Sequence, residues 1–460
     1  MNELNSEKLK SAVNYLDTWL DFNFRNSQIP GMQIAIQHGD EIIYSRAFGY
    51  ADTATNQELT TKNIFRVASH SKTFTATAIM QLVEAGKLNL DDKMSEHLDW
   101  FTSPNDERVA GVTVRQLMNH TAGIVRDGID TRYWQLLRDF PKESELIEFV
   151  SKSKLVYDAD TKFKYSNYGY GFLGLLIAKV SGVPYREYVT THIVEKLGLE
   201  STGPNLDEKA QGLLATGYGQ ELFHRKRRVF ENVDTYDLSS ATGFYSNAED
   251  LCRYFAAHFM GNTMLLSDAS KRMMQHGYWE TRGDDERYGL GMVSYSMRGW
   301  SVFGHSGGFP GFVTNTDFDA DKKIVVSVLI NSYGSNAGRI SRKIINILDT
   351  FQQNTDWITL PIKDILKFEG RYYSIWGPTD MVAVGKKLFA IEPLFWTEFD
   401  EAEELEVIDG NTLLISRASG YSSVGENIIY KFDDDGKAKS FTYAGRQMLK
   451  YDDAVKKGWF

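Results

Sequence analysis

The pattern of apolar and polar positions divides the chain into a mixed helix-and-strand part and a later β-rich part. Between Leu9 and Leu20, apolar residues recur at helical spacing and predict an amphipathic helix packed on the body. Gly31–Gln37 and Glu41–Tyr50 then alternate apolar and polar residues around a Gly-Asp turn, which is typical of a β-hairpin.

The stretch Phe65–Lys93 predicts a helix that is apolar almost all round from Phe74 to Val83. A helix of this kind lies buried in a large core. Gly86 is a suitable residue just past its end. The sequence therefore places a central helix directly after Ser69-His70-Ser71-Lys72.

Two strands and a helix are predicted further on, at Trp300–Phe303, Lys323–Ile330 and Ala337–Phe351. From about Asn354 the sequence consists of short runs of strand-forming residues separated by turn residues. This pattern predicts a small antiparallel barrel or sandwich. The runs are Phe368–Trp376, Met381–Val384, Lys387–Ile391, Thr412–Ser416, Ile428–Phe432 and Ser440–Tyr443. We expect two domains, residues 1–353 and residues 354–460.

Composition narrows the functional classes. The 460 residues suggest about two or three domains, and the net charge of −10 with a pI near 5.5 argues against nucleic acid as a partner. The single cysteine, Cys252, excludes an intrachain disulfide and fits no metal-ligand cluster. The nine histidines show no zinc-hydrolase spacing, so we expect no metal site.

The N-terminal residues lack the basic and then apolar run of a signal peptide, and no apolar run is long enough to span a bilayer. We therefore expect a cytoplasmic protein without a membrane span. A periplasmic or secreted location is the expectation if a signal peptide was removed.

The first chemical signal is Ser69 followed three residues later by Lys72, at the start of the predicted buried helix. Residues i and i+3 share one helix face, so the hydroxyl and the amine can meet. Burial near a helix N-terminus disfavours the charged amine, which lets a lysine act as a base toward serine. Ser151 and Lys154 repeat the same spacing, so the motif alone also has a chance explanation.

Tyr165 and Asn167 precede a glycine-rich and then apolar helical run. On an extended loop, residues two apart point to the same side, where a phenol can relay protons and an amide can hold a substrate carbonyl. The alternative is that both residues only form a cap and a turn.

His305 follows a predicted strand and stands among several glycines, from Gly304 to Gly311. Glycine clustered in a strand marks the close approach of a ligand or another backbone. His305 is therefore a candidate for orienting a substrate group, and a structural turn is the alternative.

Other segments favour structural roles. His120, in the predicted capped helix Val112–Gly123, is interpreted as structural, and the basic run His224–Arg228 as a solvated loop. Asp127–Phe140 fits either a mobile loop over a cleft or a packed surface helix. Cys252 is expected to be a small buried hydrophobic residue.

Taken in order, S-x-x-K, Y-x-N and H-x-G resemble the serine β-lactamase and penicillin-binding protein superfamily. The match is to the branch that holds class C β-lactamases, D-alanyl-D-alanine carboxypeptidases, D-aminopeptidases and related esterases, and it covers roughly Ile29–Asp349. The C-terminal hundred residues resemble the lipocalin-like domain of some members. The resemblance implies an α+β fold, in which an antiparallel sheet is flanked by helices, with an all-helical subdomain, followed by a small antiparallel β-barrel.

The resemblance also implies roles for individual residues. Ser69 would be the acylated nucleophile and Lys72 its base partner, while Tyr165 would pass the proton to the leaving group. The catalytic set would be completed by His305, and the substrate-binding set would be Asn167, Ser306, Gly307 and Gly308. The backbone N–H groups of Ser69 and Gly308 would form the oxyanion hole.

His305 departs from the better-known enzymes, which carry lysine at this position. Histidine is largely neutral at pH 7, so recognition of a substrate carboxylate is in doubt. We therefore predict a serine hydrolase, without a cofactor, that acts through an acyl-enzyme on amide, peptide or ester bonds of small molecules or short peptides. It would be a weak β-lactamase at best, and a homo-oligomer is a further expectation.

The alternative is a non-catalytic penicillin-binding sensor or scaffold of the same fold. The C-terminal domain is expected to act as a lid, a specificity element or an assembly surface. The aromatic residues Trp376, Phe395 and Trp396 fit such a surface or ordinary core packing.

Overall fold

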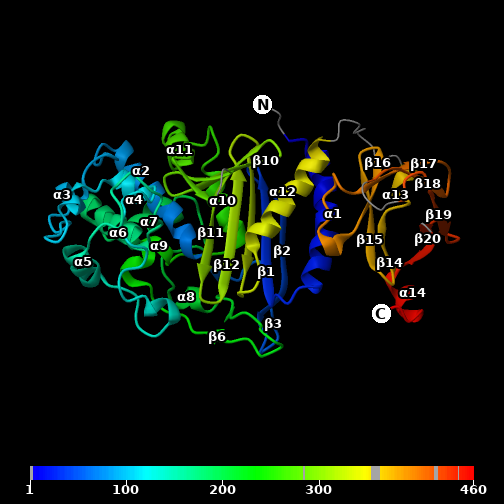
Figure 1. Cartoon of the computed structure of the whole chain (residues 1–460), viewed down its shortest axis with the longest axis horizontal. Coiled ribbons are helices and arrows are strands. Elements are labelled where there is room, and N and C mark those ends of the chain that lie inside the picture. Colours follow the sequence, from blue (N-terminus) through cyan, green and yellow to red (C-terminus); the bar gives the residue numbers. More distant parts are fainter. Residues whose placement is uncertain (1–3, 283–284, 354–362, 419–422, 444) are drawn as a thin grey trace. The chain divides into compact units, whose positions relative to one another are not determined.

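The computed structural model describes residues 4–282, 285–353, 363–418, 423–443 and 445–460 (Figure 1). The chain forms two compact units. One consists of Ile29–Arg342, and the other joins the N-terminal segment up to Gln28 to Lys343–Phe460. The expected boundary between residues 353 and 354 borders residues 354–362, which lie outside the described residues.

The first unit is built on a nine-stranded antiparallel sheet in the order β3-β2-β1-β13-β12-β11-β10-β9-β8. The predicted hairpin forms β1 and β2, with Gly31 opposite Gly49. The strands are β1 (Gly31–His38), β2 (Glu41–Asp52), β3 (Gln57–Glu58), β8 (Trp279–Arg282), β9 (Glu286–Tyr288), β10 (Val293–Met297), β11 (Trp300–Phe309), β12 (Phe312–Asp319) and β13 (Ile324–Ile330). Two small ribbons pair β4 (Phe65–Arg66) with β7 (Tyr245–Ser246) and β5 (Gly217–Tyr218) with β6 (Val229–Phe230).

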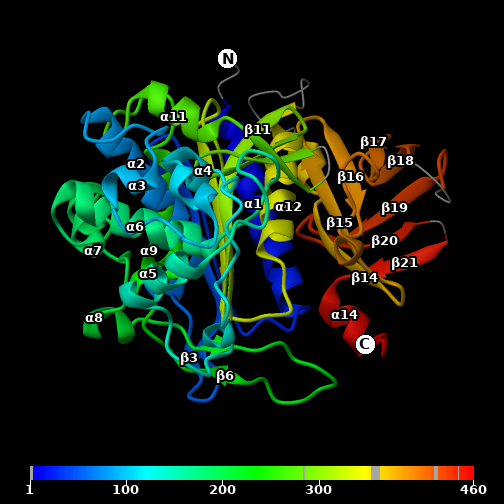
Figure 2. The ribbon, with the colours of Figure 1, turned by 60° about the vertical axis from the view of Figure 1, so that its left-hand side comes forward.

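The helices of this unit, light blue to green in Figure 1, gather beside the sheet, and Figure 2 shows them from another side. The central helix α2 is buried along nearly its whole length, as its apolar sequence predicts, and packs against α6 and α9. The helices are α2 (Ser71–Glu84), α3 (Met94–His97), α4 (Val114–Met118), α5 (Glu143–Lys152), α6 (Asn167–Ser181), α7 (Tyr185–Val189), α8 (Glu208–Gln211), α9 (Ser239–Thr242), α10 (Ala248–Ala256) and α11 (Asp268–Gln275). The predicted α+β class is confirmed.

The second unit contains a closed barrel of eight antiparallel strands, in which Tyr373 of the first strand pairs with Leu449 of the last. Buried aromatic side chains such as Phe368, Tyr372 and Tyr430 contribute to its core. The predicted lipocalin-like barrel is therefore confirmed. Its strands are β14 (Gly370–Ser374), β15 (Gly377–Val384), β16 (Lys387–Ile391), β17 (Glu403–Val407), β18 (Thr412–Arg417), β19 (Asn427–Phe432), β20 (Ala438–Tyr443) and β21 (Arg446–Leu449).

The described residues also form four helices near the two ends of the chain. The predicted N-terminal amphipathic helix is α1, and Asn5 caps it by accepting the Lys8 N–H. In the described part of the chain, no helix combines the length and apolar character needed to cross a bilayer. The remaining bounds are α1 (Ser6–Arg25), α12 (Ala337–Gln353), α13 (Lys363–Leu366) and α14 (Tyr451–Lys456).

Strand β11 lies against the segment that precedes α2. A Cβ atom at Gly307 would stand 2.2 Å from the carbonyl oxygen of Val67, so only glycine allows this approach. Pro310 and Gly311 form the two-residue loop into β12, where the φ of 89° at Gly311 suits glycine. This packing brings the His305 strand beside Ser69.

We expect Gly307→Ala to lower the free energy of unfolding by about 1–3 kcal/mol, because the added methyl group meets backbone that cannot move aside. Gly111→Ala is the matched control, since a Cβ atom there meets nothing within 4 Å. Denaturant unfolding of both variants measures the difference. Equal stabilities would contradict the close approach of β11.

Candidate active site

Ser69 lies in the 3-10 turn Ala68–His70 (η1), immediately before α2. Ala68 has a φ of 48°, a left-handed conformation that a residue with a side chain seldom adopts. His70 anchors the turn, because its Nδ1 lies 2.9 Å from the Val67 carbonyl and its Nε2 lies 3.0 Å from Thr316 Oγ1 on β12. His70 thus closes the turn onto Val67 and fastens it to the sheet through Thr316.

Three of the predicted catalytic side chains meet at one hydroxyl. Ser69 Oγ lies 3.2 Å from Lys72 Nζ and accepts a hydrogen bond of 2.9 Å from Tyr165 Oη. Tyr165 arrives from the extended segment before α6, far away in the sequence. A nucleophile in hydrogen-bond contact with a base and with a second proton-transfer group is the arrangement that activates serine.

The Lys72 amine is held by two further oxygen atoms. Nζ donates to Asn167 Oδ1 at 2.7 Å and to the Ala241 carbonyl at 2.8 Å. Burial holds the pKa of Lys72 well below its usual value, although the Asp127 carboxylate opposes this. A neutral amine has two N–H bonds, so donating both to these carbonyl oxygens leaves its lone pair facing Ser69 Oγ.

Asp127 orients this arrangement, and the sequence did not single it out. Its Oδ1 accepts hydrogen bonds from Asn167 Nδ2 at 2.6 Å and from Trp134 Nε1 at 2.9 Å. Asn167 therefore turns its amide nitrogen to Asp127 and its oxygen to Lys72. Asn167 was predicted to bind substrate, whereas here both ends of its amide are engaged inside the protein.

The ring of Tyr165 lies between the Lys72 amine and the Arg126 guanidinium. It is 4.8 Å from Lys72 Nζ and 5.2 Å from the guanidinium of Arg126. Burial raises the pKa of Tyr165, so the phenol keeps its proton at neutral pH. Tyr165 is therefore suited to donate a proton, and Lys72 to accept one.

The opposite wall is β11, where His305 has both ring nitrogens engaged. Nδ1 lies 2.6 Å from the Ser306 carbonyl, which can only accept, so Nδ1 carries the hydrogen. Nε2 must then accept from Tyr288 Oη, 3.0 Å away. Burial lowers the pKa of His305 to about 3, so the imidazole is neutral at pH 7. His305 therefore supplies neither a positive charge nor a free N–H, and it positions Tyr288 instead.

A cavity of about 490 Å³ opens between these walls. Of the predicted site residues, Ser69, Tyr165, His305, Ser306 and Gly308 line it, whereas Lys72, Asn167 and Gly307 lie behind its surface. The remaining lining residues are Arg126, Phe163, Thr281, Glu286, Tyr288, Val293, Tyr295, Gly304, Asn315, Asp317, Tyr333, Gly338 and Arg342.

The segments with open interpretations pack into the fold. His120 is buried beneath the site, with its ring 4.3 Å from that of Tyr165, and accepts the Ser166 N–H. Tyr133 is buried and donates to the Asp127 carbonyl, so the 127–140 segment is packed around η3 (Arg132–Gln135). Cys252 is buried, as expected.

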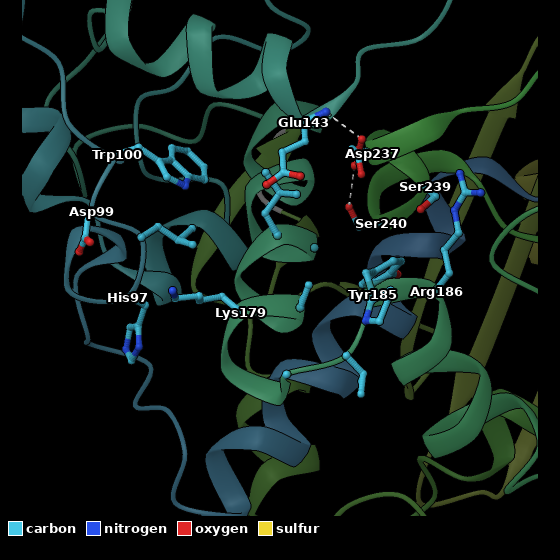
Figure 3. Close-up of a pocket in the computed structure, with 17 residues that line it drawn as sticks. His97, Asp99, Trp100, Glu143, Lys179, Tyr185, Arg186, Asp237, Ser239 and Ser240 are labelled. Atoms are coloured by element: carbon cyan, nitrogen blue, oxygen red, sulfur yellow. Dashed lines mark hydrogen bonds between the residues drawn. The ribbon is translucent and has the colours of Figure 1, made fainter.

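A second cavity of about 710 Å³ lies among the helices and does not include Ser69 (Figure 3). Trp100, Lys179 and Arg186 line part of it, and Asp237 joins two of its walls by accepting the Glu143 N–H. Helix α9 links it to the site, because Ser240 lines the cavity and the carbonyl of the adjacent Ala241 accepts a hydrogen bond from Lys72.

Comparison with known proteins agrees with this geometry. The beta-lactamase family matches residues 14–348, well over half of the chain. The chain belongs to the β-lactamase family. This β-lactamase family member is 28% identical over 317 residues to penicillin-binding protein 4* of Bacillus subtilis. The aligned region covers 65% of this chain and 67% of that protein. It is 29% identical over 322 residues to the putative penicillin-binding protein PbpX of the same organism, covering 69% and 75%.

Among solved structures, this β-lactamase family member resembles the octameric penicillin-binding protein homologue from Pyrococcus abyssi. The TM-score is 0.65 at 24% identity, and the match covers 95% of this chain and all of that one. At this identity the likeness concerns the fold.

The hydrogen bonds from Lys72 to Asn167 and from Asn167 to Asp127 predict how the site responds to pH. Because the Asp127 charge raises the pKa of Lys72, Asp127→Asn should lower that pKa and keep the amine neutral at more acidic pH. A fluorophosphonate should label Ser69 faster once Lys72 is deprotonated. The pH at which the labelling rate rises should therefore be lower in Asp127→Asn than in the wild type. The asparagine can still accept the hydrogen bond from Asn167.

Asp130→Asn is the control, because this half-buried carboxylate pairs with Arg132 in the same loop. Its pH profile of labelling should match that of the wild type. A shift of the Asp127→Asn profile toward higher pH would contradict the assigned effect of the carboxylate.

Proposed function

We propose that the protein is a serine hydrolase that forms an acyl-enzyme on Ser69 and releases it to water. One observation carries the proposal: a single hydroxyl lies 3.2 Å from a buried amine and 2.9 Å from a phenol. Membership of the β-lactamase family supports the same class of chemistry. Substrates would be small amides, short peptides or esters.

In the first half of the reaction, Ser69 Oγ would bond to the substrate carbonyl carbon while its proton passes to Lys72 Nζ. The bond from that carbon to the leaving nitrogen or oxygen would then break. Tyr165 would give its proton to the leaving group and recover one from Lys72. In the second half, water would add to the acyl carbon by the same proton path in reverse and restore Ser69.

The negative charge on the carbonyl oxygen needs donors during both halves. The backbone N–H groups of Ser69 and Gly308 are the proposed donors, because both residues line the cavity and their segments, η1 and β11, pack together. Losing one such donor typically costs about 10²–10³ in rate.

The substrate preference follows from His305. A lysine there would offer a fixed cation, whereas this imidazole is neutral and hydrogen-bonded at both nitrogens. We therefore propose weak hydrolysis of penicillins and better turnover of short acyl esters or D-amino-acid peptides.

The test combines a fluorophosphonate probe with a substrate panel of short esters, D- and L-amino-acid anilides and a cephalosporin. We expect the probe to add its mass at Ser69, and Ser69→Ala to reduce turnover by at least about 10³-fold. Short esters should exceed the cephalosporin in kcat/KM.

Stable acylation without turnover would favour the penicillin sensor instead, and absence of labelling would contradict the hydrolase. A cephalosporin turned over far better than the esters would refute only the substrate preference.

A further inference from the structure

The cavity contains a guanidinium that the proposed chemistry does not use. Arg126 lines the cavity next to Tyr165, and its side chain is 62% exposed. In the described part of the chain, its two terminal nitrogens donate no hydrogen bond to another residue, whereas its Nε lies 3.0 Å from Asp127 Oδ2. This contact at Nε leaves the two-pronged end of the side chain available to a ligand.

The backbone holds Arg126 firmly. Its carbonyl oxygen accepts the N–H groups of Asn167 at 2.8 Å and Tyr168 at 3.2 Å, at the start of α6. The neighbouring Val125 carbonyl accepts from Ser166 Oγ at 2.8 Å. The backbone of Arg126 is therefore held by the same segment that carries Tyr165, and the contacts with Asp127 and the Tyr165 ring limit where its guanidinium lies, which reduces the ordering required when it binds a ligand.

The other arginine of the cavity, Arg342, stands in a different electrostatic setting. It faces two carboxylates, because Glu286 lies 3.7 Å away and the buried Asp317 also lines this end. Its guanidinium also covers the Tyr295 ring at 4.6 Å. Two carboxylates thus lie at the Arg342 end, whereas Asp127 is the carboxylate paired with Arg126.

We propose that Arg126 binds a carboxylate on the leaving group of the substrate. The inference rests on the proposed acyl transfer, in which Tyr165 gives its proton to the leaving group. Since the guanidinium stacks on the Tyr165 ring, a carboxylate bound there belongs to the departing half of the substrate. A planar guanidinium matches two carboxylate oxygens at once.

This placement separates two kinds of anionic substrate. A carboxylate directed at β11 would meet the neutral His305, whereas one directed at the Tyr165 side would meet Arg126. Linear peptides and esters whose leaving portion carries a carboxylate therefore fit the cavity better than molecules whose carboxylate is fixed toward the strand.

The test uses two butyrate esters that differ only in their leaving group, 3-hydroxybenzoate or 3-hydroxybenzamide. The ratio of kcat/KM for the anionic ester to that for the neutral ester is measured in wild type, Arg126→Gln, Arg126→Lys and Arg342→Gln. Because Arg126 also lowers the pKa of Lys72, both esters are measured at the same pH, so that this effect cancels in the ratio.

We expect Arg126→Gln to lower the ratio about tenfold or more, mainly through KM, and Arg126→Lys to restore part of it. Arg342→Gln should leave the ratio near the wild-type value. The wild-type ratio should also fall as salt is added, because the guanidinium is exposed.

An unchanged ratio in Arg126→Gln, with both esters hydrolysed by the wild type, would overturn this inference and leave the proposed function standing. Equal losses in Arg126→Gln and Arg342→Gln would overturn it as well, because they would reflect only the summed charge of the cavity. If neither ester is hydrolysed and Ser69 is not labelled, the proposed function fails and the inference fails with it.

Discussion

The burial of one amine is the constraint on which the site depends. Lys72 lies on α2 among apolar side chains, where a charge is costly and its pKa falls well below the usual value. Two carbonyl oxygens, from Asn167 and Ala241, take its N–H bonds and leave the lone pair toward Ser69. Those oxygens come from α6 and α9, so the packing of three helices sets the direction of one lone pair. Asp127 secures the Asn167 amide from behind and moderates the loss of basicity.

The two walls of the cavity differ in charge. The Tyr165 wall carries a protonated phenol between Lys72 and Arg126, and so places a potential proton donor beside a positive charge. The β11 wall is electrically neutral at His305, because burial and two hydrogen bonds keep that imidazole uncharged. Gly307 allows this wall to approach the turn that carries Ser69. In our proposal, a carboxylate of the substrate binds Arg126 beside the proton donor Tyr165.

Much of this architecture is readable in the sequence, and the exceptions have physical causes. The apolar helix after Ser69, the β1–β2 hairpin and the late barrel follow from periodicity and turn residues. In the barrel, β17 (Glu403–Val407) was not predicted because its three glutamates are unusual in a strand, although it pairs with a strand on each side. Strand β21 was not predicted because it is only four residues long. The motif residues Ser69, Lys72 and Tyr165 come together as their order suggests. Asp127, Arg126 and Tyr288 belong to no motif and reach the site only through tertiary packing, as does the second hydrogen bond that occupies His305.

The most direct test of this account is the ionisation of Lys72 itself. In protein labelled with ¹³C at the lysine ε-carbon, the Lys72 signal can be assigned by its loss in Lys72→Arg and followed through a pH titration. The account predicts that this signal titrates well below the ordinary lysine value of about 10.4, so that the amine is neutral where exposed lysines remain charged. A Lys72 signal that titrates together with the exposed lysines would contradict it.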